Sequence, residues 1–117
     1  MRKTTSTNFE NQLKINGECG MAYTLTIIGG RWKPSILFQL LNNKRLRFNE
    51  IKKRLSGISE RILASKLKEL EENDLITRIV YQEIPPRVEY ELTEKGHTLE
   101  EILNTMSAWG EHNRDKT

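Results

Sequence analysis

The chain has 117 residues, enough for one domain that buries roughly two thirds of the surface its unfolded form exposes. It holds 19 basic and 16 acidic residues and has a pI near 9.1, so a nucleic-acid footprint would have to come from local clusters of charge. The single cysteine, Cys19, excludes an intramolecular disulfide and a cysteine-rich zinc site, and no stretch approaches the roughly 18 apolar residues of a membrane-spanning helix. We therefore expect a cytoplasmic protein that does not bind membranes.

The two ends of the chain are expected to lie outside the folded part. Residues 1–16 are polar and low in large apolar side chains, which predicts a flexible N-terminal arm. Residues 17–112 form one predicted domain, and residues 113–117 form a short C-terminal tail.

Apolar residues at helical spacing predict two helices at the start of this domain. The first helix ends at Gly29-Gly30, which allows a left-handed backbone, and Pro34 fits the first turn of the second helix. The apolar residues that recur at helical spacing in the first helix are Met21, Ala22, Leu25 and Ile28. Those of the second are Ile36, Leu37, Leu40 and Leu41, before Asn42-Asn43 closes it.

The next segment predicts a helix-turn-helix. A short alternating stretch around Arg47 precedes a compact helix over residues 50–55, and Ser56-Gly57 forms the turn. Ser59 fits the N-cap of the following helix, since its hydroxyl can accept from the free N–H groups of the first turn. We expect this helix to run to about Glu72.

The helix after Ser59 has an apolar side and a polar side. The apolar side consists of Ile62, Leu63, Leu67 and Leu70, and the polar side of Arg61, Ser65 and Lys68. Any amphipathic surface helix has a polar outer side, so periodicity alone favours contact with solvent. The position of this helix after two others favours DNA contact instead.

A β-hairpin is predicted after Asn73-Asp74 breaks the helix. Residues 75–82 are rich in β-branched side chains. The returning strand alternates Val88, Tyr90 and Leu92 with Glu89 and Glu91. The tip is predicted over residues 83–87, where Pro85-Pro86 makes the turn stiff and unable to extend the sheet.

Thr93 is expected to cap a final helix that carries a long apolar stripe. The stripe consists of Leu99, Ile102, Leu103, Met106 and Trp109. It is larger than a core of this size requires, which favours a two-fold homodimer through this helix, with the N-terminal helix in the same interface. Packing of the stripe back onto its own domain is the alternative.

Together these elements predict an α+β fold, mainly helical, as a winged helix-turn-helix domain with N- and C-terminal dimerisation helices. A helix short enough to lie in a major groove, followed by a hairpin that reaches the backbone or minor groove, indicates binding to double-stranded DNA.

Each element suggests a set of DNA contacts. Because the first residues of a recognition helix lie deepest in the groove, the expected base contacts are Ser59, Arg61, Ala64 and Ser65. The expected phosphate contacts are Lys68, Lys52, Lys53 and Arg54, the last three being solvated in the alternative interpretation. In the wing, Arg87 at the tip is expected in a narrow minor groove. Arg78 is the second wing candidate, unless it braces the hairpin through Glu89 or Glu91.

The sequence carries no local signature of an enzyme. His97 and His112 lack a second metal ligand at helical spacing, and there is no glycine-rich phosphate loop or pair of catalytic carboxylates. We expect no catalysis, no cofactor and no metal.

Two further residues have more than one interpretation. Trp32 could stack on an aromatic group but is assigned to the core. Cys19 is an inert small hydrophobe, a reactive thiolate or a surface thiol without a role.

Several short motifs are spaced along the chain from about Cys19 to Trp109. They are Cys19-Gly20, Ile28-Gly29-Gly30-Arg31-Trp32-Lys33, Arg47-Phe48-Asn49-Glu50-Ile51, Gly57-Ile58-Ser59, residues 67–71, Pro85-Pro86-Arg87-Val88-Glu89-Tyr90, Leu92-Thr93 and Gly96. In combination they resemble the HxlR family of bacterial winged-helix transcriptional regulators, relatives of the MarR group.

The resemblance implies a homodimeric DNA-binding repressor or activator that acts near its own gene and often responds to electrophiles, oxidants or small metabolites. It favours a redox role for Cys19, through a disulfide between two subunits or a mixed disulfide with a small thiol. The chain departs from the family at Gly20, where proline often follows the cysteine, so the backbone there is expected to be looser.

The leading hypothesis is therefore a sequence-specific regulator that acts as a homodimer on a palindromic operator, with half-sites about one helical turn apart. The alternative is a winged-helix module that binds a protein partner without duplex specificity.

Overall fold

The computed structural model describes residues 19–115, so the arm predicted over residues 1–16 and the end of the predicted tail, residues 116 and 117, lie outside the described residues. The chain divides into two units, one that ends at Gly30 and one that begins at Arg31, and each is described by itself.

The first unit contains helix α2 (Cys19–Ile28). The helix ends where the sequence predicts, at the two glycines. The Gly29 N–H donates to the Leu25 carbonyl at 2.8 Å, and a Cβ on Gly29 would lie 2.2 Å from that oxygen. Gly30 follows with φ of +100°, a left-handed conformation that favours glycine.

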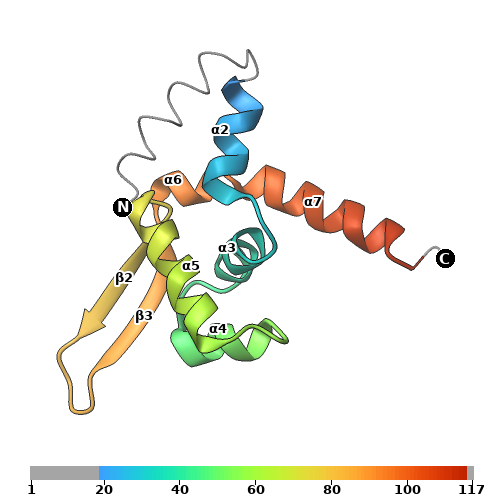
Figure 1. Ribbon diagram of the computed structural model, residues 1–117. Helices are drawn as coiled ribbons and strands as arrows, with labels where there is room; N and C mark the ends of the chain where they lie inside the picture. Colours follow the sequence, from blue (N-terminus) through green and yellow to red (C-terminus); the bar gives the residue numbers. More distant parts are fainter. Residues whose placement is uncertain (1–18, 116–117) are drawn as a thin grey trace. The chain divides into compact units, whose positions relative to one another are not determined.

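The second unit is a bundle of helices with a small antiparallel sheet (Figure 1). Its elements are α3 (Lys33–Asn42), β1 (Leu46–Arg47), α4 (Phe48–Arg54), α5 (Glu60–Glu72), β2 (Ile76–Tyr81), β3 (Arg87–Leu92), α6 (Glu94–His97) and α7 (Glu100–Asn113). In Figure 1 the hairpin β2–β3 and helix α7 extend from the bundle in different directions. This arrangement confirms the predicted winged helix-turn-helix.

Helix α3 lies in the middle of this unit, packed against α4, α5, α7 and β3. Its first turn contains Pro34, as predicted, where no intrahelical hydrogen bond is lost. Aliphatic side chains from α3, α4 and α5 form the centre of the core. They are Ile36, Leu37, Leu40, Ile51, Leu63, Leu67 and Leu70, each at most 2% exposed.

The sheet has the strand order β1-β3-β2, and both pairings are antiparallel. Its register places Arg78 opposite Tyr90 and Tyr81 opposite Arg87. Since side chains alternate between the two faces of a strand, Arg78 shares one face with the buried Tyr90, whereas Arg87 lies on the other.

Two predicted helix boundaries differ from the structure. The first helix of the helix-turn-helix begins at Phe48 rather than at residue 50, because the Glu50 carboxylate accepts from the Arg47 N–H at 2.7 Å and caps the earlier start. The single final helix expected after Thr93 is two helices. Thr93 caps only the short α6, which ends in tight turns as the N–H groups of Thr98 and Leu99 bond back three residues, and α7 then starts at Glu100.

Candidate nucleic-acid interface

The start of α5 is fixed by the predicted cap. Ser59 has an extended backbone, and its Oγ accepts from the Ile62 N–H at 3.1 Å. The turn before it contains Gly57 with φ of +92°, which a side chain would strain. Within residues 19–115 the Ser59 hydroxyl donates to no other group, so its proton is available to a base edge. Its base contact stays a prediction.

Four side chains form what we call the outward side of α5. They are Arg61, Ala64, Ser65 and Lys68, and all four are exposed. Leu63, Leu67 and Leu70 on the opposite side are buried, which confirms the two sides that the periodicity predicts. Within residues 19–115, neither Arg61 nor Lys68 forms an ion pair. Both cations are thus available to an external anion.

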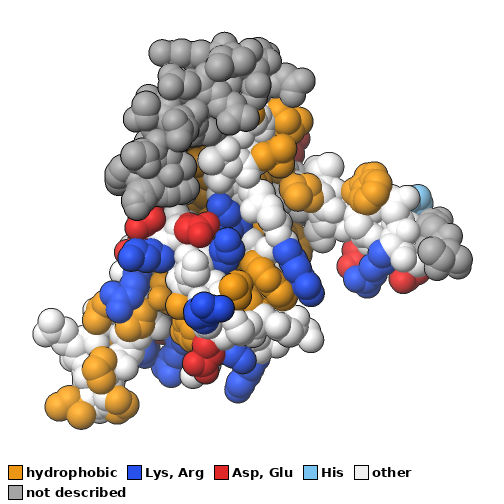
Figure 2. All heavy atoms as spheres, viewed as in Figure 1, with side chains coloured by type: hydrophobic (Ala, Val, Ile, Leu, Met, Phe, Trp, Pro, Cys, Tyr) orange, Lys and Arg blue, Asp and Glu red, His pale blue; other side chains and the backbone are white. Residues whose placement is uncertain are grey.

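The basic residues of α4 are a second group of candidate contacts. Lys53 and Arg54 are exposed and Lys52 is half-buried, and none of the three forms an ion pair in the described part of the chain. They occupy the last turn of α4, where cations interact favourably with the helix dipole. A solvated role therefore explains them as well as a phosphate contact does. Figure 2 shows lysine and arginine side chains gathered over α4 and α5.

A shallow hollow joins the recognition helix α5 to the wing. Its volume is about 320 Å³, and its lining residues are Phe48, Ala64, Leu67, Lys68, Glu71, Arg78 and Tyr90. Arg78 reaches it because strand alternation places this side chain on the same sheet face as Tyr90. The hollow brings three predicted DNA contacts, Ala64, Lys68 and Arg78, to one place on the surface. Glu71 is the acid that lines it with them.

The other face of the sheet carries a network of charged and aromatic side chains. Arg87 donates from Nη2 to Glu83 at 3.0 Å and from Nη1 to Glu89 at 3.3 Å. Its guanidinium also lies 3.8 Å from the centre of the Tyr81 ring. Tyr81 donates from its hydroxyl to Glu89 at 3.1 Å. Arg87 is therefore held by three groups of its own hairpin.

Arg45 extends this network to the segment before β1. Its Nε donates to Glu91 at 2.9 Å, and its Nη1 donates to the Tyr81 hydroxyl at 2.7 Å. The hydrogen bond with Glu91, followed by Coulomb attraction, raises the pKa of the exposed Arg45 above its ordinary value. Arg47 of β1 adds an ion pair, with its Nε 4.0 Å from Glu89, so the network connects all three strands on the face opposite the core.

These contacts reverse the structural roles expected for the two wing arginines. Arg87 lies in β3 rather than in the tip, and it braces the wing. The bracing expected of Arg78 is wrong, since Glu89 pairs with Arg87 and Arg47, while Glu91 pairs with Arg45. Arg78 is exposed and forms no ion pair within residues 19–115.

An ion pair between α3 and α5, which the sequence did not predict, joins a buried lysine to a partly exposed glutamate. Lys33 is only 8% exposed, and its Nζ lies 3.4 Å from Glu69 Oε1. Lys66 lies 3.6 Å from the other oxygen of the same carboxylate. Glu69 therefore ties the recognition helix to the central helix of the core. Local sequence patterns give no signal for the pair, because Lys33 and Glu69 lie 36 positions apart on different helices.

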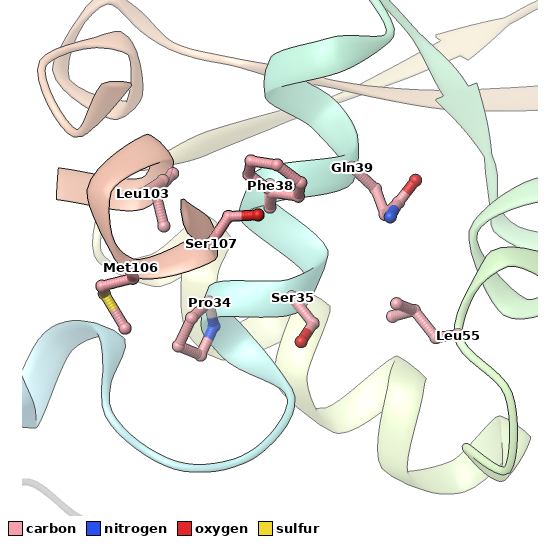
Figure 3. A pocket seen from close by; sticks show the side chains of 8 residues that line it. All are labelled: Pro34, Ser35, Phe38, Gln39, Leu55, Leu103, Met106 and Ser107. Carbon is pink, nitrogen blue, oxygen red and sulfur yellow. The ribbon is translucent and has the colours of Figure 1, made fainter. Parts of the chain in front are cut away.

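The apolar stripe predicted for the last helix divides into two parts. Leu103 is 2% exposed and packs on α3, so it is not free for a partner, whereas Leu99 is the half-buried N-cap of α7 and its predicted role in a dimer stays a prediction. Ile102, Met106 and Trp109 remain exposed by 43–69%. Figure 3 shows Leu103 and Met106 of α7 with Phe38 of α3 among the side chains that line a hollow. The volume of this hollow is about 270 Å³. This hollow is lined by Pro34, Ser35, Phe38, Gln39, Leu55, Leu103, Met106 and Ser107.

Two residues that the sequence singled out, Cys19 and Trp32, precede the helix-turn-helix in the chain. Cys19, at the start of α2, is exposed. Trp32 is half-buried and lies beneath the Arg31 guanidinium, 4.3 Å from the ring centre. No helix of the described chain is long and apolar enough to cross a membrane. The same residues also contain no cluster of three or more His, Cys, Asp or Glu side chains that could hold a metal ion.

Comparison with known proteins supplies the family. Residues 27–117 match the family described as HxlR-like helix-turn-helix. The chain belongs to this family. It is 48% identical over 96 residues to a regulatory protein named MalR from Fusobacterium mortiferum, covering 82% of this chain and 91% of that one. It is 44% identical over 97 residues to the helix-turn-helix transcriptional regulator YybR from Bacillus subtilis, covering 83% and 77%.

Solved structures agree with this HxlR-like assignment. The redox regulator HypR in its oxidized form matches with a TM-score of 0.79 at 43% identity, over 83% of this chain and 99% of that chain. The reduced transcriptional regulator YodB from B. subtilis matches with a TM-score of 0.67 at 36% identity, over 86% and 95%. The chain is therefore a helix-turn-helix transcriptional regulator of the HxlR-like family.

Removal of one hydroxyl tests the wing network. Tyr81→Phe keeps the ring beneath Arg87 but removes the group that accepts from Arg45 and donates to Glu89. We expect amide hydrogen exchange in β2 and β3 to become faster by about fivefold, since one net hydrogen bond contributes about 1 kcal/mol. Exchange in α5 stays unchanged.

Tyr90→Phe is the matched control, because the Tyr90 hydroxyl forms no hydrogen bond within residues 19–115. Equal exchange in the two variants would show that the network does not stabilise the hairpin.

Proposed function

We propose that this HxlR-like protein is a sequence-specific transcriptional regulator that works in the cytoplasm as a homodimer on a palindromic operator. The observation that carries the proposal is the outward side of α5, where Arg61 and Ser65 are exposed on a helix held by a buried leucine stripe. Arginine recognises guanine edges in the major groove, and serine bonds to donors or acceptors of several bases. The protein acts through binding alone, without catalysis.

The hollow between α5 and β2 supports a phosphate contact beside the major groove. Lys68 and Arg78 line it from two elements, and neither forms an ion pair with a described residue. A DNA phosphate there would bring the recognition helix and the wing onto one strand of the duplex. Glu71 opposes this contact, so its carboxylate limits how deeply a phosphate sits. Lys52, Lys53 and Arg54 supply further backbone contacts in this proposal.

The exposed apolar side chains support a dimer. Ile102, Met106 and Trp109 on α7 form an exposed apolar surface, and Met21 and Leu25 on α2 form another. Large exposed apolar surfaces of this kind favour association in water. A two-fold dimer through these helices would present two copies of α5 to successive major grooves.

The exposed Cys19 supports a response to oxidants. HypR, with which the chain shares 43% identity, is a redox regulator. Because the sequence holds one cysteine, oxidation would join Cys19 of two subunits or add a small thiol. A small-molecule effector, which the family resemblance implied, is the second form of control.

Selection of bound sequences from random duplex DNA, with and without a thiol oxidant, tests the function. We expect a palindrome with half-sites about one turn apart, because the two-fold symmetry of the protein is mirrored in its site. We also expect an oxidant effect that disappears in Cys19→Ser. Recovery of unrelated sequences only, or salt-insensitive binding to proteins without duplex affinity, would favour the protein-interaction module instead.

Two substitutions on α5 separate base contact from phosphate contact. Arg61→Ala is expected to bind operator and scrambled DNA with more nearly equal affinity, since a base contact contributes about 1–3 kcal/mol to discrimination. Lys68→Ala should weaken binding to both duplexes alike and reduce the salt slope by about one unit. Affinities measured over a range of salt concentrations distinguish the two effects, and a Lys68→Ala variant that changes specificity alone would contradict the assignment.

A charge placed on α7 tests the dimer. Trp109 is 69% exposed, so Trp109→Glu should leave the fold of a single subunit intact but shift sedimentation toward the monomer. Asn104→Glu, at another exposed position of the same helix and outside the apolar residues, is the control. A Trp109→Glu variant that sediments as the wild type does would rule out this surface as the interface.

A further inference from the structure

The end of the wing is apolar and fully accessible. Ile84 is 100% exposed, Val80 is 50% exposed, and both prolines of the turn are exposed. Figure 2 shows apolar side chains covering the end of the hairpin, at the lower left of the view. A single exposed apolar side chain is ordinary on a protein surface, but a branched aliphatic group followed by two prolines at the end of an extended hairpin is a small apolar wedge.

The charges beside this wedge cancel one another. Glu83 directly precedes Ile84, and its carboxylate lies 3.0 Å from Arg87 Nη2. The second nitrogen of the same guanidinium lies 3.3 Å from Glu89. An unpaired carboxylate at position 83 would be repelled by DNA phosphates, and the ion pair with Arg87 removes this repulsion. Arg47 Nε lies 4.0 Å from the same Glu89 carboxylate, so two arginines offset the two glutamates, and within residues 19–115 the charges near Ile84 balance.

The hairpin also connects the wedge to the proposed DNA surface. Val80 lies on β2 two residues after Arg78, so the two side chains share one face of the strand. Arg78 in turn lines the hollow that contains Lys68 of α5. A duplex bound to the outward side of α5 and to Arg78 would therefore also contact the apolar end of the hairpin, which lies beyond Arg78 along β2.

We propose that this apolar wedge, Ile84 with Pro85-Pro86, enters the DNA minor groove beside the half-site and contacts sugars and base edges by van der Waals packing. Apolar side chains of this kind are used by proteins that enter the minor groove. Arg87 is then a positioning residue, which neutralises Glu83 and braces the hairpin without touching DNA. The inference deepens the proposed function and depends on it.

Removal of the wedge is the first part of the test, on the full chain and the selected operator. Ile84→Ala is expected to weaken binding by about three- to tenfold through the apolar contact it loses, with an unchanged salt slope, since no cation is removed. Gln82→Ala, at an exposed neighbouring position, is the control and should bind as the wild type does. If Ile84→Ala binds the operator with the same affinity as Gln82→Ala, the proposal is overturned.

Chemical change of the minor groove is the second part. Guanine carries an amino group there that inosine lacks, whereas the two bases are alike in the major groove. With G·C pairs beside the half-site, the wild type should bind more weakly than with I·C or A·T pairs, and Ile84→Ala should lose this discrimination. Equal wild-type binding to all three flanks would contradict minor-groove entry.

A charge-cancellation pair tests the role given to Arg87. Arg87→Gln leaves Glu83 uncompensated and should weaken binding by about tenfold, a change of about 1.4 kcal/mol. Adding Glu83→Gln should restore most of the lost affinity, which a direct contact between Arg87 and DNA would not allow. If the Arg87→Gln, Glu83→Gln double variant does not regain affinity while Ile84→Ala still binds weakly, Arg87 itself binds DNA.

The outcomes for the wedge and for the proposed function are separable. Specific operator binding that is insensitive to Ile84 overturns the wedge alone. Failure of the wild-type protein to select any duplex overturns both. Normal operator binding by Ile84→Ala together with loss of a protein partner would assign the tip to protein recognition instead.

Discussion

The burial of one leucine stripe is the constraint on which the proposed interface depends. Leu63, Leu67 and Leu70 are at most 2% exposed against the central helix, and each such side chain contributes about 1.5–3 kcal/mol when fully buried. Rotation of α5 about its axis would bring these side chains into water, so the helix has one stable orientation. The Ser59 cap fixes where the helix begins, and Glu69 joins it to Lys33. Arg61 and Ser65 face outward as a consequence.

The two-residue period of a β-strand has a comparable effect on the wing. It places Arg78 on the face shared with Tyr90 and α5, and Arg87 on the face shared with Glu89 and Tyr81. One arginine is therefore available to a phosphate, whereas the other is used within the hairpin. Val80, near the end of β2, and Ile84, in the turn, lie beyond the buried part of the sheet and are exposed. In this account the wing contributes a cation near α5 and an apolar contact at its end.

Local signals allowed much of this structure to be predicted from the sequence. The Ser59 cap, the end of α5 near Glu72 and the glycine break after α2 each depend on neighbouring residues, and all three are confirmed. The roles of Arg78 and Arg87 could not be predicted, because strand register, rather than sequence spacing, decides which glutamate each one meets. The burial of Leu103 depends on where α7 crosses α3, which periodicity does not define. DNA contacts and dimerisation remain proposals drawn from exposure and charge.

Cleavage of operator DNA from a tethered iron chelate tests most directly whether the outward side of α5 lies in the major groove. The chelate is attached at Ser65→Cys in a Cys19→Ser background, which leaves one thiol in the chain. We expect strand scission centred within each half-site, and none when the chelate is placed at the exposed Thr98 between α6 and α7. Specific binding without scission from position 65, or equal scission from position 98, would contradict the orientation that the leucine stripe imposes.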